Sequence, residues 1–377
     1  MLSEEHLALR RTVRDFARRE LAPYADRNDK TGEFPRDGLE KLAQYGYLGM
    51  LVPEEYGGAG MDMLSHAICV EEVSRADASL GVIMEVHNSL HCEAIVRYGT
   101  EEQKRRWLPA LAQGRRLGAF ALTEPDAGSD AASISTRAER TARGYVLHGT
   151  KALITGAGEA DQYIVFAVTQ PGKGARGISA FVVDAATPGL SFGRTEDKMG
   201  IRASRTADVF LDGCEIPAEN LLGEENEGFR IALSLLDGGR IGIAAQALGI
   251  AQAALDRALA YAKERKQFGK AIAEFQGIQW MLAEMATDIE AARHMVYWAA
   301  RTWDEKGRAT REAAMAKLFA SRVANKHTSN AVQIHGGYGY IREYEVERLM
   351  RDAKITEIYE GTSEMMRIVI AKNLVRD

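Results

Sequence analysis

The hydrophobic period of this sequence changes twice along the chain, and this change limits the possible folds more than any other feature. Over residues 1–115, and again from residue 226, apolar side chains recur every three or four positions, as amphipathic helices require. Between residues 116 and 225 the apolar runs are short, β-branched and aromatic, and turn residues separate them, which predicts strands. We therefore predict an α+β chain with three domains: an α-helical domain at 1–115, a β-sheet, barrel-like domain at 116–225 and a four-helix bundle at 226–377.

Two segments carry the clearest helix signals. Thr100 and Gln103 have the spacing of a capping box, in which each side chain accepts a hydrogen bond from the other residue's free backbone N–H, so a helix should start there. Apolar residues step by three or four from Ile241 to Ala262, while Ala occupies the remaining faces. Such a helix is expected to be buried on several sides, within a bundle or at a subunit interface.

Charge and hydropathy exclude several classes of function. The 48 Lys and Arg against 53 Asp and Glu give a net charge of −5, without a block of like charge, so we expect no nucleic-acid or membrane partner. The first residues are acidic, whereas an export signal begins with basic ones. The most apolar stretch, Ile241–Leu255, is shorter than the ~18 residues that a membrane-spanning helix needs.

Cysteine usage points in the same direction. The three cysteines, Cys69, Cys92 and Cys214, are an odd number without paired spacing. A disulfide framework and a zinc site are therefore not expected, and no other metal site is predicted. Free thiols are typical of a reducing compartment, so the expected location is the cytoplasm.

Four local motifs are richer in chemistry than a scaffold requires. The first, residues 122–130 (LTEPDAGSD), places the hydroxyls of Thr123 and Ser129 beside Gly128, whose backbone a ligand can approach closely. This combination suits ring carbonyls and phosphates. On composition alone, however, an ordinary turn is the simpler interpretation.

The second and third motifs lie in the helical C-terminal part. Residues 265–270 (RKQFGK) end the Ala-rich helix with cations and add Phe268 as a stacking face, with the amide of Gln276 nearby. Residues 333–340 (QIHGGYGY) hold three glycines among aromatic rings, so the backbone there can lie against a flat or phosphorylated ligand. Each is also a common way to end a helix or make a turn.

The fourth motif, residues 358–364 (IYEGTSE), holds Glu360 among apolar and aromatic neighbours. Desolvation there would raise the pKa of Glu360 toward the range of a general base. Thr362 is placed to cap the final helix. The alternative is a partly exposed glutamate in a loop.

The sequence lacks the motifs of several other classes of enzyme. The sequence has no Glu-x-x-His pair for a di-iron bundle, no Gly-x-Ser-x-Gly elbow, no Walker loop and no His-Glu-x-x-His. His87 and His91 have the spacing of metal ligands on one helical face, but no third ligand is evident. Hydrolase and metalloenzyme functions are therefore disfavoured.

In this order, and over almost the whole chain, the four motifs resemble those of the acyl-CoA dehydrogenase family, the FAD enzymes of fatty-acid and amino-acid oxidation. Residues 49–58 (GMLVPEEYGG), 98–104 (YGTEEQK) and 351–362 (RDAKITEIYEGT) carry the same resemblance. The resemblance implies an N-terminal helical domain, a middle β domain and a C-terminal four-helix bundle, and most members are homotetramers.

The resemblance also implies which residues would bind FAD. One set would line the flavin and its pyrophosphate: Phe120, Leu122, Thr123, Gly128, Ser129 and Thr155. A second set would reach the cofactor from the neighbouring subunit: Arg265, Gln267, Phe268, Gln276, Gln333, Gly336 and Gly337. Thr362 and Glu364 would complete the site. Binding of FAD would then stabilise the assembly, because it links subunits.

The reaction implied by the resemblance is α,β-dehydrogenation of an acyl-CoA thioester to the trans-2-enoyl-CoA. Glu360 would be the base that removes the α-proton, while the β-carbon delivers a hydride to flavin N5 and an electron-transfer flavoprotein receives the electrons. The site must also stabilise the developing enolate. Residues expected to contact the substrate are Ser129, Asp237, Arg240, Tyr359 and Gly361.

The sequence departs from the family pattern at several positions. Some members place the base on the long helix, one residue before an Arg; that position is Gly239 here, so the alternative base is absent and Glu360 is favoured. Leu153 stands where a Trp usually lies against the flavin, and Gly156 where Asn is common. One flavin face is therefore expected to be packed differently.

Two other functions stay open. An acyl-CoA oxidase would pass electrons to oxygen and release peroxide, although this chain is shorter than typical oxidases. A catalytically silent helical scaffold of the same fold would bind no flavin, but the presence of Glu360, Thr123 and Arg265 argues against it. Among dehydrogenases, the pattern is closest to short- and medium-chain enzymes, with branched and cyclic acyl groups left open.

Overall fold

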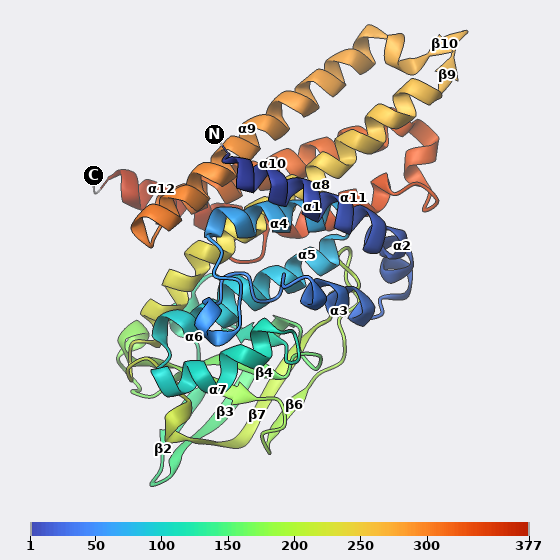
Figure 1. Ribbon diagram of the computed structural model, residues 1–377. Coiled ribbons are helices and arrows are strands. Elements are labelled where there is room, and N and C mark those ends of the chain that lie inside the picture. Colours follow the sequence, from blue (N-terminus) through green and yellow to red (C-terminus); the bar gives the residue numbers. More distant parts are fainter. Residues whose placement is uncertain (1, 376–377) are drawn as a thin grey trace.

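The structure, a computed structural model, describes residues 2–375 and has the three predicted parts (Figure 1). A sheet occupies one end of the molecule, the long C-terminal helices occupy the other, and the N-terminal helices lie between them. The N-terminal helices are α1 (Glu4–Glu20), α2 (Ala22–Thr31), α3 (Arg36–Gln44), α4 (Met63–Ala76), α5 (Ala78–Glu85), α6 (Glu93–Tyr98) and α7 (Glu101–Ala112). A π-helical segment, η2 (Val86–Cys92), joins α5 to α6.

Local sequence signals start several of these helices. The predicted capping box is confirmed: Thr100 Oγ1 accepts from the Gln103 N–H at 3.3 Å, and Gln103 Oε1 accepts from the Thr100 N–H at 2.9 Å. Asp77 caps α5 in a similar way, with its Oδ1 atom 2.9 Å from the Ser79 nitrogen. Helix α5 is buried on all sides, and this position brings its last residue, Glu85, into the interior.

The middle part is a mixed sheet. Its strands are β1 (Gly118–Ala121), β2 (Arg137–Arg140), β3 (Gly144–Thr155), β4 (Gln162–Val168), β5 (Ile178–Asp184), β6 (Leu190–Phe192), β7 (Thr206–Pro217) and β8 (Leu221–Leu222). Their order is β6-β7-β3-β2-β4-β5-β8, and β1 pairs in parallel with β4. The predicted apolar runs, at residues 144–147, 163–168, 178–183 and 208–211, lie in β3, β4, β5 and β7. Strand β1 was not predicted, because its small residues carry no β-branched signal.

The C-terminal part contains α8 (Gly228–Glu264), α9 (Gln276–Lys306), α10 (Thr310–His335), α11 (Val346–Lys354) and α12 (Ser363–Leu374). A short hairpin of β9 (Lys266–Gln267) and β10 (Lys270–Ala271) joins α8 to α9 at the tip of a projecting arm (Figure 1). The structure adds α11 to the four helices predicted. Helix α11 is short and mostly charged, and it buries only one side, including Val346, Leu349 and Ala353.

Helix α8 is longer than its apolar sequence suggests. The stretch that we expected to be too short for a membrane span is part of a helix of 37 residues. Within residues 2–375 it is the one helix long and apolar enough to cross a membrane by length and composition, but 83% of its apolar window is buried inside the protein. Core helices of globular proteins meet the same criterion.

Two hydrophobic cores hold the parts together. The larger core joins the N-terminal and C-terminal helices, where α4 packs against α8 and α9. The smaller core lies on the other side of the sheet, around Tyr163, Phe181 and Leu147. The helical parts at the two ends of the chain therefore pack as one body, and the site described next lies where they meet.

Candidate active site

Glu360 lies in a tight turn between α11 and α12, with an unusual backbone conformation. Its φ is +53°, in the left-handed region that residues other than Gly and Asn seldom adopt, and Gly361 follows with a φ of +103°. Two buried cations bind the carbonyl oxygens of this turn. Arg240 Nε donates to the Glu360 oxygen at 3.3 Å, and Lys317 Nζ donates to the Gly361 oxygen at 2.5 Å. These contacts from α8 and α10 fix the turn that presents the Glu360 carboxyl to the interior.

The environment of Glu360 gives its carboxyl the properties of a base near neutral pH. Burial raises the pKa of Glu360 to about 7, and this effect outweighs the interaction with the neighbouring Glu85 carboxyl and the charges of Lys317 and Arg240, which lower it. Its Oε2 atom is buried without a hydrogen-bond partner in the described chain. A carboxyl with such a pKa can accept a proton at neutral pH and release it again.

Gly239 on α8 makes room for this carboxyl. A Cβ atom at position 239 would lie 2.2 Å from Glu360 Oε2, so the Glu360 carboxyl would have to move. The position that carries the base in some family members is therefore filled here by the Glu360 carboxylate.

A second buried carboxyl, which the sequence analysis missed, lies beside Glu360. Glu85 at the end of α5 has no exposed surface, and its Oε1 accepts a hydrogen bond from Ser89. One turn along α8 from Gly239, Gly242 gives Glu85 its space, since a Cβ there would lie 2.4 Å from Glu85 Cγ. Burial and the nearby Glu360 raise the pKa of Glu85 well above its usual range.

Asp237 and Arg240, both predicted to contact substrate, form a buried pair next to the base. Arg240 Nη1 lies 3.0 Å from Asp237 Oδ1, and Thr310 also donates a hydrogen bond to Asp237. Burial raises the pKa of Asp237 and lowers that of Arg240, with each partner opposing the shift of the other. The predicted contact Tyr359 donates its hydroxyl to Gln246 on α8. The structure thus brings Asp237, Arg240, Tyr359, Glu360 and Gly361 together.

The TEPDAGSD motif forms the loop after β1 and lies against β3. The Ala152 N–H donates to the Thr123 oxygen at 2.8 Å, which places Thr123 beside the strand that carries Thr155. Inside the loop, Glu124 accepts hydrogen bonds from the Ser135 and Thr136 backbone and from Lys151 Nζ at 2.7 Å. Because Lys151 and Glu124 are both buried, this pair fixes the loop's shape.

The first set of predicted FAD residues surrounds this loop, while Ser129 lies at its exposed end. A Cβ at Gly128 would meet no atom within 4 Å, so the backbone there is open to a ligand. Leu153 is 64% exposed at a φ of +57° between Thr123 and Thr155. Gly156 has a φ of +81°, a conformation that suits Gly or Asn and so accounts for the departure noted above.

The second set gathers at the far end of the C-terminal helices. Arg265, Gln267, Gly336 and Gly337 line a cavity of about 430 Å³ together with Tyr261 and Tyr338. The Arg265 guanidinium lies 5.4 Å from the ring centre of Tyr338, and no atom lies within 4 Å of a Cβ built at Gly336 or Gly337. His335 also lines the cavity and stacks on Tyr261 at 4.2 Å. The aromatic residues of this cavity were not among the predicted ones.

Of the remaining predicted FAD residues, all but the half-buried Thr362 are exposed. Phe268 is 94% exposed at the hairpin tip, and Gln276 and Gln333 are exposed on α9 and α10. Thr362 caps α12 as predicted, accepting from the Met365 N–H at 3.3 Å. Glu364 is exposed and pairs with Arg367.

The base and the second set of predicted FAD residues lie far apart within a single chain. Arg240, beside the base, lies in α8, and Arg265, at the second cavity, is the residue directly after the end of α8, 25 positions along the chain. At 1.5 Å per residue, roughly 37 Å separates them. The second cavity is therefore too distant to contact a group that reacts at Glu360.

Both sets have the chemistry that FAD requires. The first offers hydroxyls, open backbone and apolar surface to a ring and its phosphates, and the second offers a cation, aromatic faces and two open glycines to an anionic group and an adenine. Within residues 2–375, no group of three or more His, Cys, Asp or Glu side chains is arranged to bind a metal ion. His87 and His91 instead bind the start of the sheet: His87 Nδ1 accepts from the Gly118 N–H, and His91 Nδ1 lies 2.9 Å from the Ala119 oxygen.

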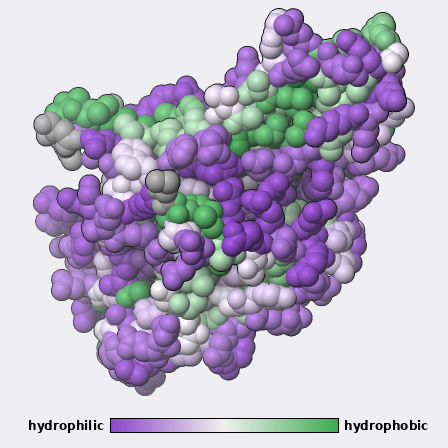
Figure 2. All heavy atoms as spheres, turned by 45° about the horizontal axis from the view of Figure 1, so that its top comes forward, coloured by the Kyte–Doolittle hydropathy of each residue, from purple (hydrophilic) through white to green (hydrophobic). Residues whose placement is uncertain are grey.

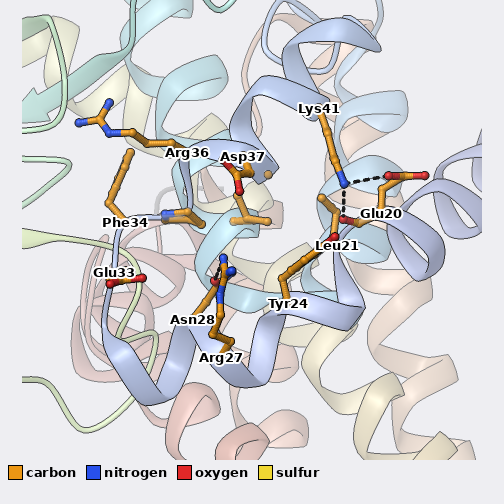
Figure 3. Close-up of a pocket in the computed structure, with 13 residues that line it drawn as sticks. Glu20, Leu21, Tyr24, Arg27, Asn28, Glu33, Phe34, Arg36, Asp37 and Lys41 are labelled. Atoms are coloured by element: carbon orange, nitrogen blue, oxygen red, sulfur yellow. Dashed lines mark hydrogen bonds and ion pairs between the residues drawn. The ribbon is translucent and has the colours of Figure 1, made fainter.

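A further cavity, of about 300 Å³, lies among α1, α2 and α3 (Figure 3). Its charged side chains are partly paired with one another: Lys41 Nζ lies 2.8 Å from Glu20 Oε2. Leu80 of α5 forms part of its wall, whereas Glu85, near the base, does not line it. This cavity holds none of the predicted site residues.

Comparison with known proteins agrees with this geometry. Models of the acyl-CoA dehydrogenase N-terminal, middle and C-terminal domains match residues 3–115, 119–214 and 226–375. The mitochondrial short-chain specific acyl-CoA dehydrogenase of Rattus norvegicus is 51% identical over 375 residues, which cover 100% of this chain and 91% of the relative.

Two solved structures have the same fold. Butyryl-CoA dehydrogenase from Megasphaera elsdenii superposes with a TM-score of 0.97 at 46% identity, covering 100% of this chain and 99% of the other. A chain in the structure described as the electron transferring flavoprotein of Acidaminococcus fermentans superposes with a TM-score of 0.98 at 49% identity, covering 100% and 99%. With matches over its full length, this chain belongs to the acyl-CoA dehydrogenase family.

Proposed function

We propose that this protein is an FAD-dependent acyl-CoA dehydrogenase that converts an acyl-CoA thioester to the trans-2-enoyl-CoA, with Glu360 as the base. The observation that carries the proposal is the Glu360 carboxyl itself. It is held in a left-handed turn by Arg240 and Lys317, and its pKa is raised to about 7. A buried carboxyl poised near neutral pH suits the removal of an α-proton.

The chain's own residues would carry the proton chemistry as follows. Glu360 accepts the α-proton of the thioester on its carboxylate. Arg240 and Lys317 hold the backbone of the turn, so that the carboxylate faces the α-carbon throughout. The backbone N–H of Glu360 is the donor that the family resemblance assigns to the thioester oxygen, where negative charge develops. FAD, the cofactor of this family, supplies the hydride acceptor when bound.

We also propose that the active protein is a homotetramer, because the second set of predicted FAD residues lies far from the base within one chain. The projecting arm supports a second copy as partner: Trp280 is 61% exposed and Phe268 94% exposed there. Figure 2 shows apolar side chains gathered along this arm and again near the C-terminal end of the chain, where Leu374 is 56% exposed. Apolar patches of this kind mark interaction surfaces.

The names of the relatives support a substrate and a partner. A short-chain specific dehydrogenase and a butyryl-CoA dehydrogenase favour a short, straight acyl group. The structure described as an electron transferring flavoprotein favours such a protein as electron acceptor. We propose a role in fatty-acid β-oxidation in the cytoplasm, since Cys69, Cys92 and Cys214 are all buried free thiols.

An anaerobic titration with acyl-CoAs of increasing chain length, monitored by the visible flavin absorbance, tests the function. We expect a short acyl-CoA to bleach the wild-type flavin and to leave Glu360→Gln oxidised, a rate loss of about 10²–10⁴-fold or more. Bleaching that survives in the Gln variant would show that another group is the base. Peroxide formation in air would favour the oxidase, and a purified protein that cannot bind flavin would favour the silent scaffold.

A further inference from the structure

The Glu85 and Glu360 carboxyls form a buried pair on one face of α8. Gly239 and Gly242, one helical turn apart, leave the space that the two carboxyls fill. Each carboxyl has an Oε2 atom that is buried and lacks a hydrogen-bond partner in the described chain. Two such oxygens would be costly to leave unsatisfied, and one proton between the carboxyls would satisfy both.

The charges around the pair are not symmetrical. Glu360 faces Arg240 from α8 and Lys317 from α10, whereas Glu85 takes part in no ion pair within residues 2–375. The other polar side chain at Glu85 is Ser89 of η2, which donates to its Oε1. Asp237 on α8 is paired with Arg240, and the Tyr359 hydroxyl is bound to Gln246. The negative charge is therefore more stable on Glu360, and the proton more stable on Glu85.

We propose that Glu85 is a positioning residue for Glu360: it holds the one proton of the pair in the substrate-free protein and donates it in a hydrogen bond to the Glu360 carboxylate. The inference rests on the proposed role of Glu360 as base. Glu85 keeps Glu360 ionised and aimed at the substrate without adding a second negative charge. The interaction between the two carboxyls lowers the pKa of Glu360 and raises that of Glu85, the direction expected when Glu85 is the donor.

Infrared spectroscopy of the holoenzyme without substrate tests where the proton lies. A protonated buried carboxyl has a C=O stretching band that a carboxylate lacks. At pH 9, well above the pKa of about 7 of Glu360, we expect this band in the wild type and in Glu360→Gln, and its loss in Glu85→Gln. A wild-type spectrum without the band, or a band that Glu360→Gln removes and Glu85→Gln keeps, would overturn the proposal. This readout needs no turnover, so it stands even if no acyl-CoA proves to be a substrate.

The pH dependence of anaerobic flavin reduction by butyryl-CoA tests the effect on the base. Glu85→Gln retains an N–H donor of the same shape, so its rate should rise with pH at nearly the wild-type midpoint. Glu85→Leu removes the donor, and its midpoint should move up by about one pH unit, a roughly tenfold loss of rate on the acidic side. Identical midpoints for Glu85→Leu and wild type would overturn the proposal, because a purely structural role changes rates without moving the midpoint. If butyryl-CoA bleached the flavin in none of the three proteins, the result would count against the proposed function instead.

Discussion

At the scale of single residues, the absence of a side chain at position 239 is as important as the carboxyl at 360. We expect Gly239→Ala to lower the rate of flavin reduction by about 10²-fold, because its Cβ would lie 2.2 Å from Glu360 Oε2 and push the carboxylate away. Stopped-flow reduction with a short acyl-CoA measures this. FAD content should not change.

Gly238→Ala provides the matched control on the same helix. A Cβ there would contact the Met63 and Trp303 side chains at 3.4 Å, an ordinary packing distance. This variant should keep a rate within a few-fold of the wild type. Equal losses in both variants would point to a general effect of alanine in α8 rather than to displacement of the base.

Lys317 should influence both the conformation of the turn that holds Glu360 and the pKa of the Glu360 carboxyl. Its amino group is buried and binds the Gly361 oxygen, and burial lowers its pKa to about 8. In Lys317→Met the base loses a cation that lowers its pKa, so the midpoint for flavin reduction, expected near pH 7 in the wild type, should move to higher pH. Rates measured from pH 6 to 9 give the midpoint.

Lys317→Arg keeps the charge and should move the midpoint less than Lys317→Met does. The sign follows from the base: only ionised Glu360 accepts a proton, so the rate rises as pH passes upward through the pKa. A midpoint that falls in Lys317→Met would contradict the assigned role of this cation.

Sequence alone identifies Glu360 but not the residues that control it. The motif around 358–364 places a glutamate among apolar neighbours, and this local pattern is enough to suggest a raised pKa. Lys317 and Glu85 belong to residue types that are usually exposed, and they meet Glu360 from helices far away in sequence. Only the tertiary structure shows that they are buried together.

At the scale of elements, the loop after β1 depends on the buried pair of Glu124 and Lys151. Burial raises the pKa of Glu124, but Lys151 and the hydrogen bonds from residues 135 and 136 outweigh it and lower the pKa to about 2, while burial lowers the pKa of Lys151 to about 8. The attraction between the two charges is offset by the cost of burying them, so the intact pair adds little to the free energy of unfolding. Removal of one partner leaves a buried charge without compensation.

We therefore expect Lys151→Met to lower the free energy of unfolding by about 3–5 kcal/mol and to weaken FAD binding. The double variant Glu124→Gln, Lys151→Met should recover part of the stability, because it buries no charge. Thermal unfolding with and without FAD measures both effects. If the double variant lost as much stability as Glu124→Gln and Lys151→Met lose in sum, the two side chains would not be coupled.

The acid stability of this loop follows from the same pair. Glu124 has a pKa below its unfolded value, so its contribution is present above about pH 4.5 and is lost as pH falls toward 2. FAD release on acidification should therefore begin at a higher pH in Glu124→Gln than in the wild type. Fluorescence of released flavin during an acid titration reports this, and identical curves would argue against the role of Glu124.

Most elements could be predicted from local sequence, and the failures have local causes. Thr100 with Gln103, and the β-branched runs of β3, β4, β5 and β7, are strong signals because they report on adjacent residues. Strand β1 is short and consists mostly of small residues, and helix α11 is amphipathic but only nine residues long, so their neighbours in space stabilise them. The π-helical turn of η2, which aligns Ser89 with Glu85, has no sequence signature.

At the scale of the whole molecule, FAD binding and assembly should depend on each other. We expect Arg265→Gln to lose FAD on dilution and to unfold at a lower temperature than wild type, because its cation lies in the cavity proposed for a neighbouring copy's cofactor. Added FAD should restore stability, since a ligand at 100 times its Kd contributes about 2.7 kcal/mol. Gel filtration with absorbance detection, together with thermal unfolding, measures the effect.

Arg257→Gln is the control for this prediction. Arg257 lies on the same helix, pairs with Glu345 and is outside the cavity. Its loss should leave FAD content and assembly unchanged, because exposed ion pairs contribute little. If both variants lost FAD equally, surface charge in general, rather than Arg265, would be responsible.

The uninterrupted length of α8 restricts how this protein can evolve. Arg240 beside the base and Arg265 at the second cavity have a fixed separation and rotation, because α8 runs without interruption from Arg240 to the residue before Arg265. An insertion of one residue between them would advance Arg265 by about 1.5 Å and rotate it by about 100°. Loops can therefore gain or lose residues, but a change in the number of residues between those two arginines would disturb the proposed assembly.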